Sequence, residues 1–148
     1  MNKNKVRIGG ASAFYGDSQL SARQLVEKGE IDYLVFDYLA EVTMAILSQA
    51  KAKNEKLGYA VDFITVAMRD VLQDCAQKGI KVIANAGGVN VPACIESLNA
   101  LCAQLNLNLN IVGVYGDNLL NDMRNETLAE TNTHDLDNGN ELPNALAS

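Results

Sequence analysis

The chain of 148 residues has no tryptophan and few aromatic residues, which make up 5% of it. Its three cysteines, Cys75, Cys94 and Cys102, form no CxxC pair, and His134 is the single histidine. The sequence therefore predicts no disulfide framework and no zinc site of nitrogen and sulfur ligands. It also predicts no Ser-His-Asp or Cys-His catalytic site. All three cysteines fall within predicted helices, which is typical of a reducing compartment.

Long apolar runs and positive charge are also scarce. No apolar run approaches the roughly 18 residues of a membrane span, and no signal-like apolar region follows the polar residues Met1–Lys5. There are 12 basic and 18 acidic side chains, for a net charge of -6, and the basic ones form no stripe. We therefore expect a cytoplasmic protein with neither a membrane nor a nucleic acid as its partner.

The acidic excess lies in the C-terminal part of the chain. Residues 1–116 contain 11 basic and 11 acidic side chains, whereas residues 117–148 contain seven acids and only Arg124 as a base. Such a polar segment, with a turn signal at Asp137-Asn138-Gly139, buries too little apolar area to offset its ordering entropy. We predict one α/β domain over residues 1–124 and a poorly ordered acidic tail over residues 125–148.

Short apolar runs that end in small or polar residues recur along the chain. They predict strands near residues 6–9, 32–37, 81–86 and 110–115. Runs such as Leu34-Val35-Phe36 and Val82-Ile83-Ala84 are continuous rather than alternating, which predicts strands covered on both faces. Four strands are few for a self-contained parallel sheet, so we expect the chain to be part of a larger domain.

Helical periodicity separates these runs. A first helix would begin near Asp17 or Ser18, two more would span Leu39–Lys53 and Ala60–Lys78, and a fourth would be N-capped by Asn90. Cys94, in the first turn of that fourth helix, would have a lowered thiol pKa unless it is buried, which its apolar face favours. The alternation predicts an α/β fold of three-layer, Rossmann-like type with a mainly parallel sheet of about four strands. A partial (β/α) barrel is the alternative.

Parallel strands place their carboxyl ends at one edge of the sheet, where ligands of open α/β sheets bind. We therefore expect the polar residues that follow the strands to line a single cavity. The members of this predicted cavity are Ser12, Asp37, Glu41, Asn85, Gly88 and Asp117. The wider predicted ligand-binding set consists of Ser12, Gly16, Asp17, Asn85, Gly87, Gly88, Asn90, Gly116 and Asp117.

Carboxylates are the candidate catalytic groups. Asp37 and Glu41 lie four residues apart, so both could serve as general acid and base, or hold a divalent cation with Asp17 or Asp117. Stabilisation of a helix N-terminus is the structural alternative for each. Asn85 offers both a donor and an acceptor, and the Gly87 and Gly88 amides beside it could polarise a carbonyl, with tight-turn geometry as the alternative.

The loop Gly9–Asp17 is rich in small residues and precedes a predicted helix. This is a general setting for anion binding by backbone amides. The loop matches neither GxGxxG nor a phosphate-binding loop with Lys-Ser/Thr, so a purely structural turn remains open beside phosphate binding.

Ordered blocks of sequence add a resemblance to a known family. The blocks are RIGGASAFYGDS (7–18), DYLVFDYLAEVTM (32–44), GIKVIANAGGVN (79–90) and GDNL (116–119). In these blocks, and from about Val6 to Ala147, the chain resembles the N-terminal domain of the acyclic terpene utilisation (AtuA) family. One departure is Tyr15, which stands where tryptophan is common.

The resemblance implies a role in the catabolism of citronellol- or geraniol-like acyclic terpenes through CoA thioesters. An acyl-CoA would be a substrate rather than a cofactor, and a homo-oligomer through the rest of the family domain stays open. Family members continue well beyond the length of this chain, so later strands would complete the sheet. Three functions follow as hypotheses: an enzyme or its N-terminal part, a non-catalytic binding or assembly subunit, and a truncated product without activity.

Overall fold

The computed structural model describes residues 5–117, 134 and 136–140. The chain forms two compact units, Met1–Gly113 and Val114–Ser148, and each is described by itself. In the second unit residues 136–138 form a turn, in which the Asn140 amide donates to Asn138 Oδ1 at 2.8 Å. The turn signal at Asp137–Gly139 is thereby confirmed. The predicted boundary at residue 124 and most of the predicted tail lie outside the described residues.

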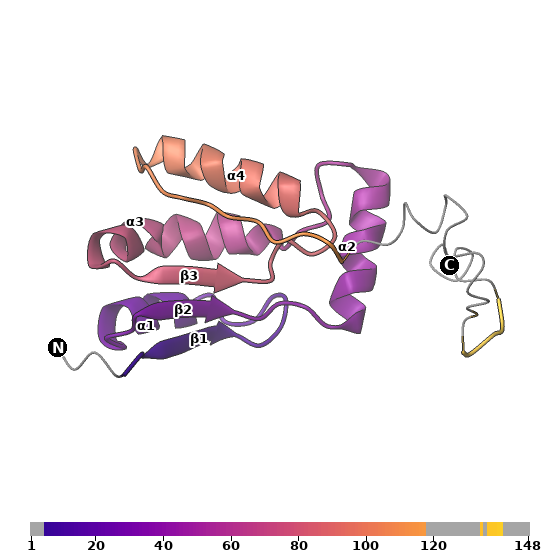
Figure 1. Ribbon diagram of the computed structural model, residues 1–148, viewed down its shortest axis with the longest axis horizontal. Coiled ribbons are helices and arrows are strands. Elements are labelled where there is room, and N and C mark those ends of the chain that lie inside the picture. Colours follow the sequence, from indigo (N-terminus) through magenta and orange to yellow (C-terminus); the bar gives the residue numbers. More distant parts are fainter. Residues whose placement is uncertain (1–4, 118–133, 135, 141–148) are drawn as a thin grey trace. The chain divides into compact units, whose positions relative to one another are not determined.

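The first unit alternates strands and helices, as the sequence predicts (Figure 1). Its elements are β1 (Ile8–Ser12), α1 (Ser21–Lys28), β2 (Tyr33–Phe36), α2 (Glu41–Lys53), the π-helix η1 (Phe63–Met68), α3 (Arg69–Lys78), β3 (Lys81–Ala84) and α4 (Val91–Gln104). Strands β1, β2 and β3 pair in this order, and both pairings are parallel. The α/β class is confirmed, and the arrangement fits a partial Rossmann-like fold. None of the helices among the described residues is both long and apolar enough to span a membrane.

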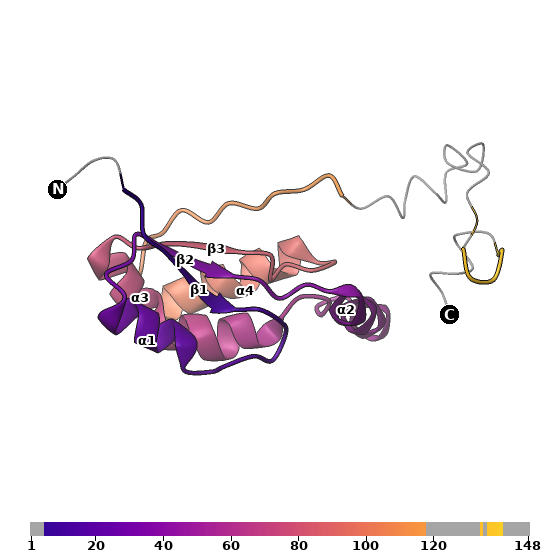
Figure 2. The ribbon, with the colours of Figure 1, turned by 90° about the horizontal axis from the view of Figure 1, so that it is seen from below.

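The strand predicted at residues 110–115 is absent, and the sheet of the described residues has three strands. Figures 1 and 2 show residues 107–113 running in an extended conformation past the β3 side of the sheet. Leu107 and Ile111 pack against the core, but Val112 is 85% exposed. The segment buries little apolar surface against β3. Its strand-like sequence pattern therefore does not result in pairing with β3.

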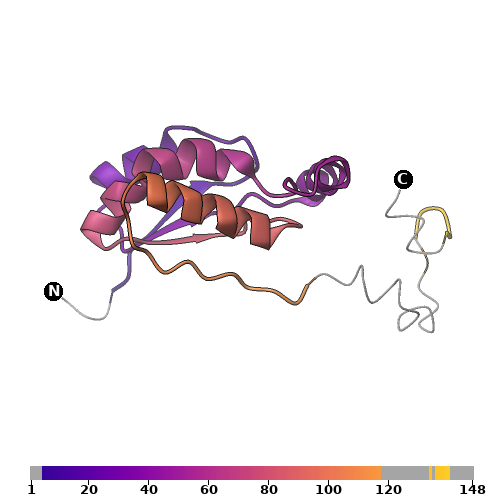
Figure 3. The ribbon, with the colours of Figure 1, turned by 90° about the horizontal axis from the view of Figure 1, so that it is seen from above.

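The described helices of the first unit cover one face of the sheet. Figures 2 and 3 show α1, α3 and α4 on the same face. On that face Leu34 and Phe36 are 0% and 3% exposed, whereas Ile8 and Ile83 on the other face are 66% and 55% exposed. The expectation that the strands are covered on both faces is therefore wrong for the described residues. Apolar side chains on both faces produced the continuous runs, which do not reveal whether a second layer is present.

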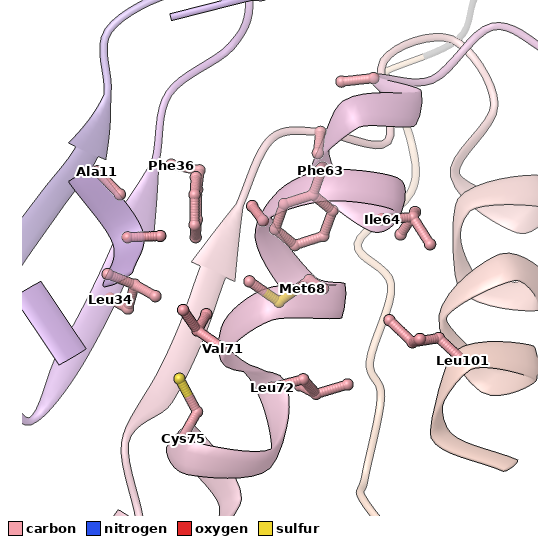
Figure 4. Close-up of a cluster of buried hydrophobic side chains, with 14 of the residues drawn as sticks. Ala11, Leu34, Phe36, Phe63, Ile64, Met68, Val71, Leu72, Cys75 and Leu101 are labelled. Atoms are coloured by element: carbon pink, nitrogen blue, oxygen red, sulfur yellow. The ribbon is translucent and has the colours of Figure 1, made fainter. Parts of the chain in front are cut away.

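The core lies between the covered face of the sheet and the η1–α3 helix (Figure 4). Its largest fully buried side chains are Leu34, Met68, Val71 and Cys75. The helix predicted at Ala60–Lys78 is present, but with a π-helical segment in its first half. It ends at Gly79, whose left-handed backbone (φ 68°) forms the C-cap, as the Lys78-Gly79 pair predicts.

Strand β1 includes residues that the sequence pattern assigns to a loop. It spans Ile8–Ser12 rather than residues 6–9, so Gly9 and Gly10 lie in the sheet. A Cβ atom on Gly9 would lie 3.1 Å from Leu25 Cδ2 of α1. Gly9 therefore belongs to the close packing of α1 on β1 rather than to a turn.

Candidate functional site

Polar residues from all three strand ends meet at the carboxyl edge of the sheet, beyond which α2 lies (Figure 1). Ser12 Oγ donates to the Asp37 carbonyl at 3.3 Å, and the Asp37 amide donates to the Ser12 carbonyl at 3.3 Å. Asn85 Nδ2 donates to Asp37 Oδ1 at 2.7 Å, while Asn85 Oδ1 accepts from the Tyr38 amide at 2.7 Å. We call Ser12, Asp37 and Asn85 the strand-end network.

This network fixes an exposed carboxylate. The side-chain oxygen of Asn85 accepts the Tyr38 backbone amide, so the side-chain nitrogen points at Asp37. The Asp37 side chain is thereby oriented while the residue stays exposed. A carboxylate held in this way can accept a proton or a hydrogen bond from a ligand at the sheet edge.

A small cavity adjoins the strand-end network. Its volume of about 20 Å³ is enough for one water-sized oxygen atom. Its lining consists of Ser12, Asp17, Ser18, Gln19, Tyr38, Asp62, Val66 and Ala67. We call it the Asp62 cavity. Ser12 belongs to both, and the Tyr38 amide donates to Asn85, so the cavity and the network are contiguous.

Asp62 is the residue that the sequence-based prediction misses. Its Oδ1 atom is buried and has no hydrogen-bond partner in the part of the chain that the structure describes. Burial raises the pKa of the Asp62 carboxyl, and the backbone amides of Phe63 and Gly16 oppose this only in part. The available signal is an acid between Val61 and Phe63 in an apolar stretch, where a solvated helix face would not be expected.

Two tyrosines face Asp62. Tyr38 is 4% exposed, and its ring meets that of Tyr15 edge-on at 6.3 Å. Burial, followed by the nearby Asp62 carboxylate, raises the pKa of both hydroxyls, and a hydrogen bond with Ser12 lowers that of Tyr38 slightly. Tyr38 therefore keeps its proton and can act as a hydrogen-bond donor. Its ring also stacks on Phe36 at 5.8 Å and contacts Phe63 at 6.1 Å, which holds it in place.

The π-helix η1 explains how Asp62 reaches the cavity. Asp62 directly precedes η1, and Val66 and Ala67 within η1 line the same cavity. Spacings of four and five residues share one face when hydrogen bonds run from residue i to i+5, as they do in a π-helix. Such segments within α-helices occur frequently at functional sites. A purely α-helical reading of residues 60–78 does not predict this arrangement.

Asp17 closes the loop that follows β1. Its Oδ2 accepts from the Ala13 amide at 2.9 Å, and its Oδ1 accepts from the Ser18 amide at 2.7 Å. Gly16, next to it, has the positive φ of 84° that such a turn requires. The prediction that Asp17 or Ser18 caps the first helix is wrong, because α1 begins at Ser21 after the N-cap residue Leu20.

The loop between β3 and α4 is held by structural contacts. A Cβ atom on Gly88 (φ 51°) would lie 2.5 Å from Leu47 Cδ1 of α2. Asn90 is the N-cap residue of α4, but its side chain makes no cap hydrogen bond. Its Nδ2 instead donates to the carbonyls of Glu55 at 2.7 Å and Leu57 at 2.6 Å. Close packing thus accounts for Gly88 and Asn90, and ligand binding by Gly87, Gly88 and Asn90 stays a prediction.

The remaining predicted residues are Glu41, Gly116 and Asp117. Glu41 is the first residue of α2 and is exposed, a position where a carboxylate stabilises the helix dipole. Gly116 and Asp117 belong to the second unit, so their place in a shared cavity stays a prediction. Among the described residues no three His, Cys, Asp or Glu side chains come close enough to hold a metal ion.

A protein-family model matches most of the chain. The model of the family described as acyclic terpene utilisation family protein AtuA matches residues 6–147. None of the curated proteins and none of the solved structures compared with the chain matches it.

Proposed function

The chain belongs to the acyclic terpene utilisation (AtuA) family, and we propose that the carboxyl edge of its sheet binds a small organic acid or the acyl-CoA thioester of one. Family membership supplies the general setting, the utilisation of acyclic terpenes. The observation that supports the site is the strand-end network, in which Asn85 orients the exposed carboxylate of Asp37. Ligands of open parallel sheets bind at this edge.

In this proposal Asp37 is the group that exchanges a proton with the ligand. Asn85 holds the Asp37 carboxylate in one orientation, so less entropy is lost when a ligand proton approaches it. Glu41 is the second candidate for proton transfer, because it begins the helix that lies beyond the strand ends (Figure 1). The proposed reaction class is proton transfer on the acid or thioester.

Calorimetric titration tests the proposal. Citronellic acid and its CoA thioester would be titrated into the full chain and into the variants Asp37→Asn and Asn85→Ala. Because hydrogen bonds to charged groups contribute about 1.5–3 kcal/mol, each variant is expected to weaken binding by roughly ten- to a hundredfold.

Asp32→Asn is the matched control. Asp32 lies at the amino end of β2, and its Oδ2 accepts from the Arg7 amide at 2.8 Å, a bond that asparagine can keep. Its binding is expected to equal that of the unchanged chain. Wild-type affinity in both Asp37→Asn and Asn85→Ala, with folding intact, would refute the proposal.

A non-catalytic binding subunit is the second candidate. The position of Glu41 favours it, since an exposed carboxylate in the first turn of α2 is explained by helix stabilisation alone. Saturable binding of the thioester without any change of the bound molecule would support this function over catalysis. The measurement is mass spectrometry of the thioester after prolonged incubation with the chain.

A further inference from the structure

The buried Asp62 Oδ1 atom has no hydrogen-bond partner among the described residues. Buried polar atoms in folded proteins are nearly always hydrogen-bonded, and an exception calls for a water, an ion or a ligand atom. Among the described residues Oδ1 has no such partner, and the adjoining Asp62 cavity has about 20 Å³ of space. One oxygen atom fits this space.

The groups around Asp62 identify the chemistry of that atom. Ser12 at the end of β1 and the loop residues Asp17, Ser18 and Gln19 line the cavity. Tyr38 follows β2, and η1 contributes only apolar side chains. Both Asp17 carboxylate oxygens already accept backbone amides, so Asp17 offers no donor. The donors available to the cavity are thus the hydroxyls, the Gln19 side-chain amide and, when protonated, the Asp62 carboxyl.

We infer that the Asp62 cavity binds one carbonyl or carboxyl oxygen of the ligand, with the Asp62 carboxyl group and the Tyr38 hydroxyl as its hydrogen-bond donors. Water takes that place in the free protein. This inference rests on the proposed function and deepens it, because Ser12 and Tyr38 connect the cavity to the strand-end network. In this inference the carbonyl oxygen of one ligand lies in the cavity and an adjacent carbon lies at Asp37.

Such a pair of donors has a chemical consequence. A neutral carboxylic acid beside a tyrosine hydroxyl stabilises negative charge that develops on a carbonyl oxygen. Loss of a proton from the carbon beside that carbonyl produces this charge. Asp37 would accept the proton while Tyr38 and the protonated form of Asp62 stabilise the oxyanion, which assigns distinct roles to the two aspartates.

The pH dependence of thioester binding provides the test, because a thioester carbonyl does not titrate. In the unchanged chain, binding of citronellyl-CoA is expected to weaken as the pH rises through the raised pKa of Asp62, where the donor is lost. Tyr15, Asp17 and Tyr38 also face Asp62, but the tyrosines stay protonated over this range. Asp62→Asn keeps a donor without a titrating group, so its binding is expected to stay within about threefold and to lose this pH dependence.

Two further variants measure the donors directly. Tyr38→Phe and Asp62→Ala each remove a donor and are expected to weaken binding about tenfold. Glu96→Gln, an exposed acid on α4, is the control and is expected to have no effect. If Asp62→Ala does not fold, Asp62→Asn and Tyr38→Phe still decide the question.

The outcomes separate this inference from the proposed function. Weaker binding in Asp37→Asn, together with unchanged binding and pH profile in the Asp62 and Tyr38 variants, would overturn the inference alone. The opposite pattern would overturn the strand-end proposal and keep the cavity. Absence of binding in the unchanged chain would overturn both. If Mg²⁺ or Ca²⁺ stabilised the unchanged chain against unfolding but not Asp62→Asn, the cavity would be a cation site and the donor role would be overturned.

Discussion

Replacement of Gly88 by alanine tests whether this glycine is required for packing or for a ligand. Gly88 lies in the β3–α4 loop with a positive φ of 51°. An alanine Cβ there would lie 2.5 Å from Leu47 Cδ1 and 2.7 Å from the Gly58 carbonyl oxygen. Leu47 can shift its methyl group, but the Gly58 carbonyl also accepts the Val89 amide at 2.9 Å and cannot move without weakening that bond.

The expected loss of stability is the sum of two effects. A left-handed backbone costs a non-glycine residue about 1–2 kcal/mol, and overpacking of a close contact costs about 1–3 kcal/mol more. Gly88→Ala is therefore expected to lower the free energy of unfolding by roughly 2–5 kcal/mol. Gly79→Ala, with φ 68° and open space around its Cβ position, is expected to lose only about 1–2 kcal/mol. Gly10 has neither a positive φ nor an atom within 4 Å of its Cβ position. Gly10→Ala is therefore expected to change stability by less than about 0.5 kcal/mol.

Urea unfolding, followed by far-ultraviolet circular dichroism, measures all three variants under the same conditions. The expected order of destabilisation is Gly88→Ala, then Gly79→Ala, then Gly10→Ala. Equal unfolding free energies for Gly88→Ala and Gly79→Ala would refute the packing argument. A Gly88→Ala variant as stable as Gly10→Ala but unable to bind the thioester would instead show that the glycine is there for the ligand.

Three further predictions concern the core and the surface. Leu34→Ala, at a fully buried position, is expected to cost about 3 kcal/mol in urea unfolding, whereas Ile83→Ala, 55% exposed on the open sheet face, is expected to cost about 1 kcal/mol. Equal costs would mean that the open face is covered. Burial raises the pKa of Cys75 and Cys94 to about 11, so at neutral pH iodoacetamide is expected to label the native thiols far more slowly than the urea-unfolded ones, as mass spectrometry would show. Arg23→Met removes the ion pairs between α1 and α3 and is expected to cost about 1 kcal/mol, less at high salt; a cost independent of salt would contradict an ionic origin.

The sequence by itself determines the alternation of strands and helices. The apolar runs at β2 and β3 lie within one or two residues of their predicted positions, as do the helix periodicities of α2 and α4. Local patterns suffice there because each element is long enough to show its own period. The meeting of Ser12, Asp37 and Asn85 is also predictable, since parallel strands bring all their carboxyl ends to one edge.

Only the tertiary structure decided which apolar surfaces are buried. The run Leu34-Val35-Phe36 has apolar side chains on both faces of the sheet, and the described helices cover one of these faces. The same limit explains the missing fourth strand: residues 110–115 have a strand pattern but contribute little to the core. A local pattern reports how apolar a segment is, whereas burial depends on neighbours that are distant in the sequence.

Asp62 shows this limit at the candidate site. An acid in a helix is usually solvated, as are Asp70 and Asp74, which pair with Arg23 on the surface. The apolar neighbours of Asp62 in the sequence indicate burial but not which residues surround it. Its neighbours Tyr15 and Tyr38 come from distant parts of the sequence, and the π-helix η1 follows it directly. The unpaired oxygen and the raised pKa are therefore properties of the assembled fold, because desolvation is the sum of contacts that no single segment contains.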